Sequence, residues 1–113
     1  MKIWLPVSSP MNERKLLSLL GLAQRAGKAL SGEFVIERAI RAGKVHCLIV
    51  AADAAENTRK KYRDMTTYYA VPCVEALSKD ALSGGIGREN RAAIAITDAG
   101  MSQALKKLLS DTQ

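Results

Sequence analysis

The sequence predicts an α/β fold, a three-layer α/β/α sandwich in which helices cover both faces of a sheet. Apolar residues at helical spacing alternate with short apolar runs along the whole chain. Two of these runs, Val45–Ala52 and Ala92–Thr97, are nearly continuous, as expected for strands buried on both faces. Strands separated by helices imply βαβ crossovers, so the layers follow from the order of the elements. The 113 residues suit one compact domain.

The N-terminal part of the chain predicts two consecutive helices. Gly27 lies where a residue in the left-handed conformation would end the first helix. Ser31 or Gly32 begins the second helix, and Gly43 closes it. The faces that we expect to be buried consist of Leu16, Leu19, Leu20 and Ala23 in the first helix and Val35, Ile36, Ala39 and Ile40 in the second.

Polar residues mark the starts of three further helices. Asp53 is placed to cap the third helix, and Glu56 makes this start similar to a capping box. Ser78 caps a brief helix that runs into the Gly84–Gly87 loop, and Asp98 caps the last helix. The expected inward residues are Tyr62 and Met65 in the third helix and Met101, Leu105, Leu108 and Leu109 in the last.

One short strand, Val71–Val74, contains Pro72. Proline has no backbone N–H to donate, so we expect this strand at the periphery of the sheet or at a position where the missing donor is harmless.

The chain is basic, and its charge is unevenly distributed. The formal net charge is +6. Residues 11–44 carry seven basic residues against three acidic ones, and a second basic cluster spans Arg59–Arg63. This balance favours a polyanion or a membrane surface as partner. The Arg59–Arg63 run is expected to face solvent, with contact to a distal RNA phosphate as the alternative.

Cysteine usage and hydropathy favour a cytoplasmic location. Cys47 and Cys73 lie inside apolar runs without CxxC spacing, which argues against a disulfide framework or a zinc site. No apolar segment approaches the ~20 residues of a membrane span, so we expect no membrane partner. Met11-Asn12-Glu13 resembles a natural start. We therefore assign residues 1–10 to an N-terminal extension, whose native status the sequence leaves open, and residues 11–113 to the domain.

Two glycine-containing segments are the strongest functional signal in the chain. Arg25-Ala-Gly-Lys-Ala-Leu-Ser-Gly-Glu33 leads into the second helix, and Ser83-Gly-Gly-Ile-Gly-Arg88 leads into the last strand. Glycine lets backbone N–H groups approach a ligand closely, and a helix N-terminus adds partial positive charge. In a small basic protein, two such segments predict a phosphate-rich partner, which we interpret as RNA.

Each of these features also has a purely structural interpretation. Ser31 and Gly32 are common helix caps, and Glu33 would repel phosphate unless it accepts a hydrogen bond from a base amino group. Phe34 lies on a stripe with Arg38 and Arg41. It can stack on a base, contact a protein, or tuck under the first helix, and the sequence does not decide among the three.

The sequence shows no equipment for catalysis. His46 is the only histidine, and its neighbour Cys47 must point to the opposite face of a strand, so the two cannot form a nucleophile–base pair. The Gly84–Gly87 glycines follow a helix and precede a strand, the reverse of a dinucleotide-binding loop. We expect no enzymatic activity, no cofactor, no metal and no small-molecule substrate.

The chain contains, in this order, the segments Leu20–Lys28, Ser31–Glu33, Ala39–Gly43, Ala52–Thr58, Tyr68–Pro72, Ile86–Gly87 and Ile96–Asp98. Together these segments resemble the motifs of YlxQ-like proteins, bacterial members of the superfamily of ribosomal proteins L7Ae and L30e. The resemblance covers the chain from about Met11 to about Leu109. It implies a four-stranded mixed sheet, and RNA binding, often to kink-turns, in a ribosomal context.

The chain departs from the family pattern at one motif. Kink-turn binders of this superfamily carry Gly-Thr-Asn-Glu-x-x-Lys at the start of the second helix. The matching positions here are Gly32, Glu33, Phe34, Val35 and Arg38, so only the glycine is identical and the lysine is replaced by a like charge. The Asn-Glu pair that bonds sheared G·A base edges is missing.

The resemblance also implies that the Leu82–Gly87 loop packs against a flipped-out nucleotide.

The sequence therefore predicts a small, monomeric RNA-binding protein of the ribosome or of translation-coupled machinery, with ribosomal RNA as the expected partner. The alternative is a protein-interaction module that kept the fold and lost RNA recognition. The residues expected to contact RNA are Arg25, Lys28, Ser31, Gly32, Glu33, Phe34, Arg38, Arg41, Gly84, Gly85, Ile86 and Arg88.

Overall fold

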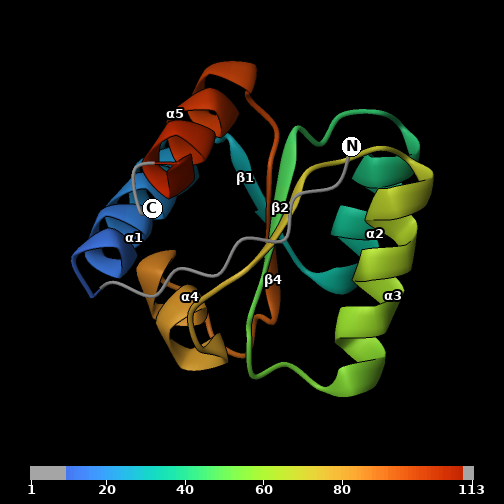
Figure 1. Ribbon diagram of the computed structural model, residues 1–113, viewed down its shortest axis with the longest axis horizontal. Helices are drawn as coiled ribbons and strands as arrows, with labels where there is room; N and C mark the ends of the chain where they lie inside the picture. The colour runs from blue at the N-terminus through green and yellow to red at the C-terminus, as the bar shows by residue number, and fades with distance from the viewer. Residues whose placement is uncertain (1–9, 111–113) are drawn as a thin grey trace.

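Two helical layers enclose a central sheet in the computed structural model, which describes residues 10–110 and the side chains of residues 13–108. Helices α2 and α3 cover one face of the sheet, and α1, α4 and α5 cover the other (Figure 1). The predicted three-layer α/β/α fold is thus confirmed. The elements are α1 (Pro10–Arg25), β1 (Ala29–Ser31), α2 (Glu33–Arg41), β2 (Cys47–Val50), α3 (Glu56–Tyr68), β3 (Cys73–Glu75), α4 (Lys79–Gly85), β4 (Ala93–Ile96) and α5 (Ala99–Ser110).

The sheet is mixed and has four strands in the order β1-β4-β2-β3. β2 and β3 are parallel and are joined by α3, which gives one βαβ crossover. β4 runs antiparallel to both of its neighbours, and its residue Ala95 pairs with Leu30 of β1 and Leu48 of β2. The last strand in the sequence therefore lies inside the sheet, and β1 and β3 form the two edges.

The core forms where both helical layers meet the two central strands. Every residue of β2 and β4 is buried, which explains their continuous apolar sequences. Leu16 and Leu20 of α1 pack from one side, and Ile36 and Ile40 of α2 pack from the other. Burial on both faces makes these two strands the rigid support for the loops at their ends.

Several helix ends follow the sequence prediction. Gly27 adopts φ 72° directly after α1, and Lys28 N donates to the Ala23 carbonyl, as in a Schellman-type end. Ser78 Oγ accepts from Ala81 N at the start of α4, and Asp98 Oδ2 accepts from Met101 N at the start of α5. The strand predicted over Val71–Val74 is instead β3 (Cys73–Glu75), at the edge of the sheet. Pro72 precedes it and only accepts a hydrogen bond, from Leu48 N, so the strand does not need the N–H that proline lacks.

Three local predictions differ from the structure. Asp53 does not cap α3, because α3 begins after Ala55 and has no side-chain cap. Instead, Asp53 Oδ1 accepts a hydrogen bond from Lys79 N and so stabilises the start of α4. Val35 is not part of the buried face of α2, because 46% of it is exposed. Strand β1 was not predicted by periodicity, since three residues at a sheet edge carry almost no pattern.

The predicted N-terminal extension, residues 1–10, lies outside the described residues except for Pro10, which begins α1. The side chain of Leu109, expected on the inner face of the last helix, also lies outside the described set.

Candidate nucleic-acid interface

The first glycine segment forms the start of α2. Gly32 is the N-cap residue, with φ 102° and ψ 126°, and no side chain caps this helix end. The Gly32 carbonyl already accepts from Ile36 N, so the first backbone N–H groups of α2 are left without intrahelical acceptors. Ser31, the alternative cap, is instead the last residue of β1. The helix opening therefore presents backbone donors and the positive end of the helix dipole.

The second glycine segment ends α4 and reverses the chain towards β4. Gly87 has φ 68° and Asn90 has φ 57°, which gives the tight turn its left-handed positions. Gly84, Gly87 and Arg88 are exposed. Ile86 is only 5% exposed, so its side chain cannot lie over a base or ribose as expected from the sequence. Gly85 lies against α1, where an added Cβ would come within 2.9 Å of Leu17 Cδ2. Glycine at this position therefore allows α4 to pack closely against α1.

Both segments lie at the same end of the sheet because β1 and β4 are antiparallel, so the end of β1 lies beside the start of β4. Arg91 links the two segments there. Ser83 Oγ accepts from Arg91 N at 2.8 Å and donates to the Arg91 carbonyl at 3.2 Å. The Arg91 side chain continues across to β1, where its Nε donates to Ser31 Oγ at 3.2 Å. We use the name glycine surface for the half-buried Gly32 together with the exposed residues Glu33, Gly84, Gly87, Arg88 and Asn90.

A small polar hollow opens beside the start of α2. It has a volume of about 170 Å³ and lies between α2, α3 and the loop before β4. Gly32, Glu33, Thr58 and Asn90 line its polar part, and the buried ring of Tyr62 forms part of its wall. The hydroxyl, amide and carboxylate groups can together donate to and accept from the edge of a small planar group.

Lys61 neutralises the carboxylate at the helix opening. Its Nζ donates to Glu33 and, at 2.8 Å, to Glu37, and it lies 5.0 Å from the centre of the Tyr62 ring. Burial alone would lower the pKa of Lys61, but the hydrogen bonds that its ammonium donates to the two carboxylates outweigh burial and raise the pKa above its usual value. The ammonium thus stays charged, so Glu33 does not present an uncompensated negative charge to an anion.

The basic run Arg59–Arg63 is not a free cationic patch. Arg59 donates to the Ala54 carbonyl and lies 3.9 Å from Glu75, which also accepts from Arg63. Lys60 pairs with Asp64 at 3.3 Å. Because four basic residues share acidic partners on α2, α3 and β3, the run mainly ties these elements together.

The remaining predicted cations are spread over the molecule. Arg25 lies on α1 in a groove that also includes Gly85, close to the end of α4. Lys28 precedes β1 at the strand end opposite Gly32 and pairs with Asp98 at 3.7 Å. Arg41, at the end of α2, pairs with Glu37 at 3.8 Å. Of the predicted cations, Arg88 therefore belongs to the glycine surface, and Arg25 lies beside Gly85 at the end of α4.

Phe34 and Arg38 are two further predicted residues, and both are exposed on α2. Phe34 is 79% exposed, which rules out packing under the first helix and leaves stacking on a base or contact with a protein. Arg38 lies along the outer side of α2, next to Val35 and Ala42.

Sequence reasoning missed four residues at this interface, namely Thr58, Lys61, Asn90 and Arg91. The sequence signal for these four residues was weak. Lys61 was one of several basic residues on a helix, and Asn90 and Arg91 followed the glycines without a motif of their own. Only the folded chain brings them to Gly32.

The described residues hold no arrangement that favours covalent or metal chemistry. No three His, Cys, Asp or Glu side chains within them come close enough to hold a metal ion. Burial raises the pKa of the Cys47 and Cys73 thiols to about 12, so both stay protonated and are poor nucleophiles. None of the helices in the described part of the chain could cross a membrane.

The sequence of this chain matches known proteins over most of its length. Residues 14–106 match the model of the ribosomal protein L7Ae/L30e/S12e/Gadd45 family. A protein of Enterococcus faecium named RNA-binding protein YlxQ is 41% identical over 98 residues, which cover 87% of this chain and 94% of that protein. The protein of the same name from Bacillus subtilis (strain 168) is 38% identical over 99 residues, covering 88% and 99%.

Solved structures share the fold. A protein with unknown function from Bacillus halodurans C superposes with a TM-score of 0.78 at 38% identity, covering 85% of this chain and 97% of that one. The Giardia lamblia 15.5kD RNA binding protein superposes with a TM-score of 0.75 at 17% identity, covering 93% and 90%. The predicted resemblance is confirmed by these matches, and the chain belongs to the ribosomal protein L7Ae/L30e/S12e/Gadd45 family.

Proposed function

We propose that this protein is a small, non-enzymatic RNA-binding protein that acts as a cytoplasmic monomer in the ribosome or in translation-coupled machinery. The observation that carries the proposal is the hydrogen-bonded link that Arg91 makes between Ser83, in the second glycine segment, and Ser31, in the first. Relatives with 41% and 38% identity are named RNA-binding proteins, which supports RNA as the polyanion. The net charge of +6 agrees with such a partner.

Backbone groups make the main contacts in this proposal. An RNA phosphate lies against the uncapped start of α2, where N–H groups and the helix dipole favour an anion. Gly84 and Gly87 let the sugar–phosphate backbone approach the second turn closely. Arg88 and Arg25 flank the contact and supply positive charge, and Lys61 removes the repulsion that Glu33 would otherwise cause.

A few side chains contribute to the recognition of bases. The polar hollow beside Gly32 offers Thr58 and Asn90 to the edge of an unstacked base, and the exposed ring of Phe34 offers a stacking surface. The Asn-Glu pair for sheared G·A pairs is absent from this helix opening. We therefore propose recognition of RNA shape and of an unpaired nucleotide, with no requirement for a kink-turn.

The alternative function, a protein-interaction module that has lost RNA binding, is favoured by the 79% exposure of Phe34. Binding of the protein to ribosomal RNA at several salt concentrations separates the two. Only the RNA-binding function predicts measurable affinity that falls steeply with added salt.

A further inference from the structure

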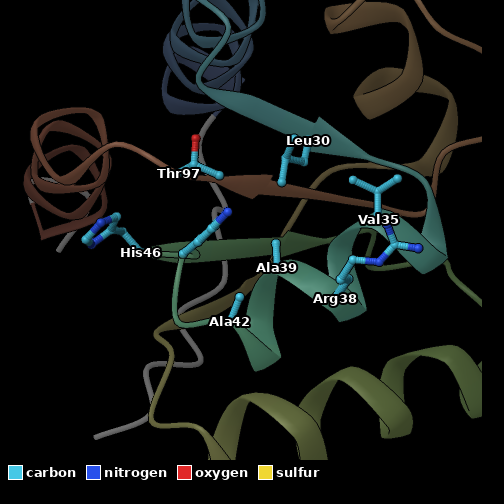
Figure 2. A pocket seen from close by; sticks show the side chains of 8 residues that line it. Leu30, Val35, Arg38, Ala39, Ala42, His46 and Thr97 are labelled. Atoms are coloured by element: carbon cyan, nitrogen blue, oxygen red, sulfur yellow. The ribbon is translucent and has the colours of Figure 1, made fainter.

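A second hollow lies on the outer side of α2, along the edge of the sheet. It has a volume of about 570 Å³, within the range of binding pockets in proteins. Its floor is aliphatic and consists of Leu30 of β1, Val35 and Ala39 of α2, and Ala42, the C-cap residue of α2 (Figure 2). We call this hollow the α2–β1 groove.

Positive charge borders the groove without visible compensation. Arg38 and Lys44 supply this charge at the rim, which His46 also lines, and no ion pair of these two cations is found among the described residues. The nearby acids are already engaged elsewhere: Glu33 and Glu37 bind Lys61 on the side of α2 that faces α3. A ligand that fits the groove must therefore combine aliphatic groups with negative charge.

Asp98 adds no free negative charge to this region. Its carboxylate binds Lys28 and accepts from Met101 N at the start of α5. The positive rim consequently faces solvent with its charge intact.

The groove also runs beside an open strand edge. β1 pairs only with β4 in the described part of the sheet. Thr97 N donates to the Lys28 carbonyl, so the antiparallel alternation turns the Lys28 and Leu30 backbone groups towards β4 and those of Ala29 and Ser31 away from it. An extended peptide added at this edge would point alternate side chains towards the face of the sheet that carries Leu30 and α2.

We propose that the α2–β1 groove binds an acidic, extended peptide segment of a protein partner. Aliphatic side chains of the peptide fill the floor, its carboxylates lie at Lys44 and Arg38, and its backbone adds to the edge of β1. A peptide fits the groove because its floor is aliphatic and the open edge of β1 offers backbone groups to an extended chain. This function is additional to RNA binding at the glycine surface.

The test begins with selection of random peptides displayed on phage, about a dozen residues long, against the immobilised full-length chain. The expected result is enrichment of sequences that combine Asp or Glu with Leu, Ile or Val. The most enriched peptide is then synthesised with a fluorescent label, and its affinity is measured by fluorescence anisotropy. Failure to enrich acidic aliphatic peptides would overturn the proposal.

Matched variants locate the binding. Ala42→Glu and Lys44→Glu change exposed residues of the groove and should weaken peptide binding about tenfold or more, whereas Lys44→Arg should keep it. Lys15→Glu makes the same charge change on α1, across the sheet, and should alter the affinity less than about twofold. Circular dichroism checks that each variant is folded.

The affinity of the same variants for ribosomal RNA distinguishes this proposal from the proposed function. Lys44→Glu should reduce RNA affinity no more than Lys15→Glu does. If both groove variants bind the peptide as well as the unmodified protein, the peptide binds elsewhere and the proposal is wrong. If they instead lose RNA affinity selectively, the groove is part of the RNA surface and the proposal is equally wrong.

Discussion

Arg91 Nε donates a hydrogen bond of 3.2 Å to Ser31 Oγ, although 60 positions separate the two residues in the sequence. Ser31 ends β1 immediately before the uncapped start of α2, and Arg91 follows the glycine turn after α4. The backbone of Arg91 is in turn held by the Ser83 hydroxyl. This link fixes the relative position of two loops that would otherwise be joined only through the sheet.

The first prediction concerns this link. Ser31→Ala and Arg91→Ala should each destabilise the protein, and the two changes should not add, because either one removes the same hydrogen bond. The expected coupling in a double-mutant cycle is about 0.5–1.5 kcal/mol, measured by urea unfolding. Effects that add to within about 0.3 kcal/mol would show that the two side chains do not interact in solution.

The second prediction concerns the backbone at Gly32, whose φ of 102° disfavours any residue with a side chain. Gly32→Ala and Gly32→Asp should both cost about 1–3 kcal/mol of unfolding free energy. Space is not the cause, since an added Cβ would meet only Val35 Cγ2 at 3.9 Å. Both variants should therefore fold with reduced stability.

RNA affinity then separates the two Gly32 variants. The carboxylate of Gly32→Asp should repel the phosphate at the helix opening and lower the affinity at least about tenfold below that of Gly32→Ala, which carries the same strain without the charge. Equal affinities for the two variants would exclude the helix opening from the RNA contact.

The third prediction tests the cap that the structure assigns to Asp53. Because its Oδ1 accepts from Lys79 N, Asp53→Ala should destabilise the protein by about 0.5–2 kcal/mol. Glu56→Ala serves as the control, since α3 has no side-chain cap and Glu56 is exposed; its effect should stay within about 0.5 kcal/mol. If Glu56→Ala instead destabilised the protein more than Asp53→Ala in thermal unfolding, a capping box at the start of α3 would be supported and the cap on α4 contradicted.

The fourth prediction is a loss of stability at alkaline pH. Burial raises the pKa of Cys47 and Cys73 from 9.0 to about 12 and that of Tyr62 from 10.0 to about 12. The folded protein thus holds protons that the unfolded chain releases, so the stabilisation is complete below pH 9 and declines as the pH rises towards 12.

The midpoint of urea unfolding, measured in steps above about pH 8, should fall accordingly. Cys47→Ala removes one of the three groups and should make the decline shallower. A midpoint that stays constant up to about pH 11 would contradict the burial of these groups.

Local sequence patterns predicted the elements whose causes are local. The apolar runs of β2 and β4 report burial on both faces, and Gly27, Ser78 and Asp98 end or begin helices through contacts within a few residues. Local patterns did not predict β1, because its three residues become a strand only by pairing with β4.

The missed interactions join distant parts of the chain. Asp53 and Lys79 lie 26 positions apart, and Lys61 and Glu33 lie 28 positions apart. The pattern around Asp53 satisfied a local capping rule, but the tertiary contact with α4 prevailed. For the candidate site, both glycine turns were recognisable from sequence, whereas the residue that joins them, Arg91, and the burial of Ile86 depend on packing.

The salt dependence of binding to ribosomal RNA tests the central claim most directly. If the glycine surface and the neighbouring Arg25 contact about four to six phosphates, the logarithm of the association constant should fall with the logarithm of salt concentration at a slope of roughly −3 to −5. The slope should become shallower by about one in Arg88→Ala. An affinity that does not change with salt, or no binding to ribosomal RNA at all, would contradict an RNA-binding function for this surface.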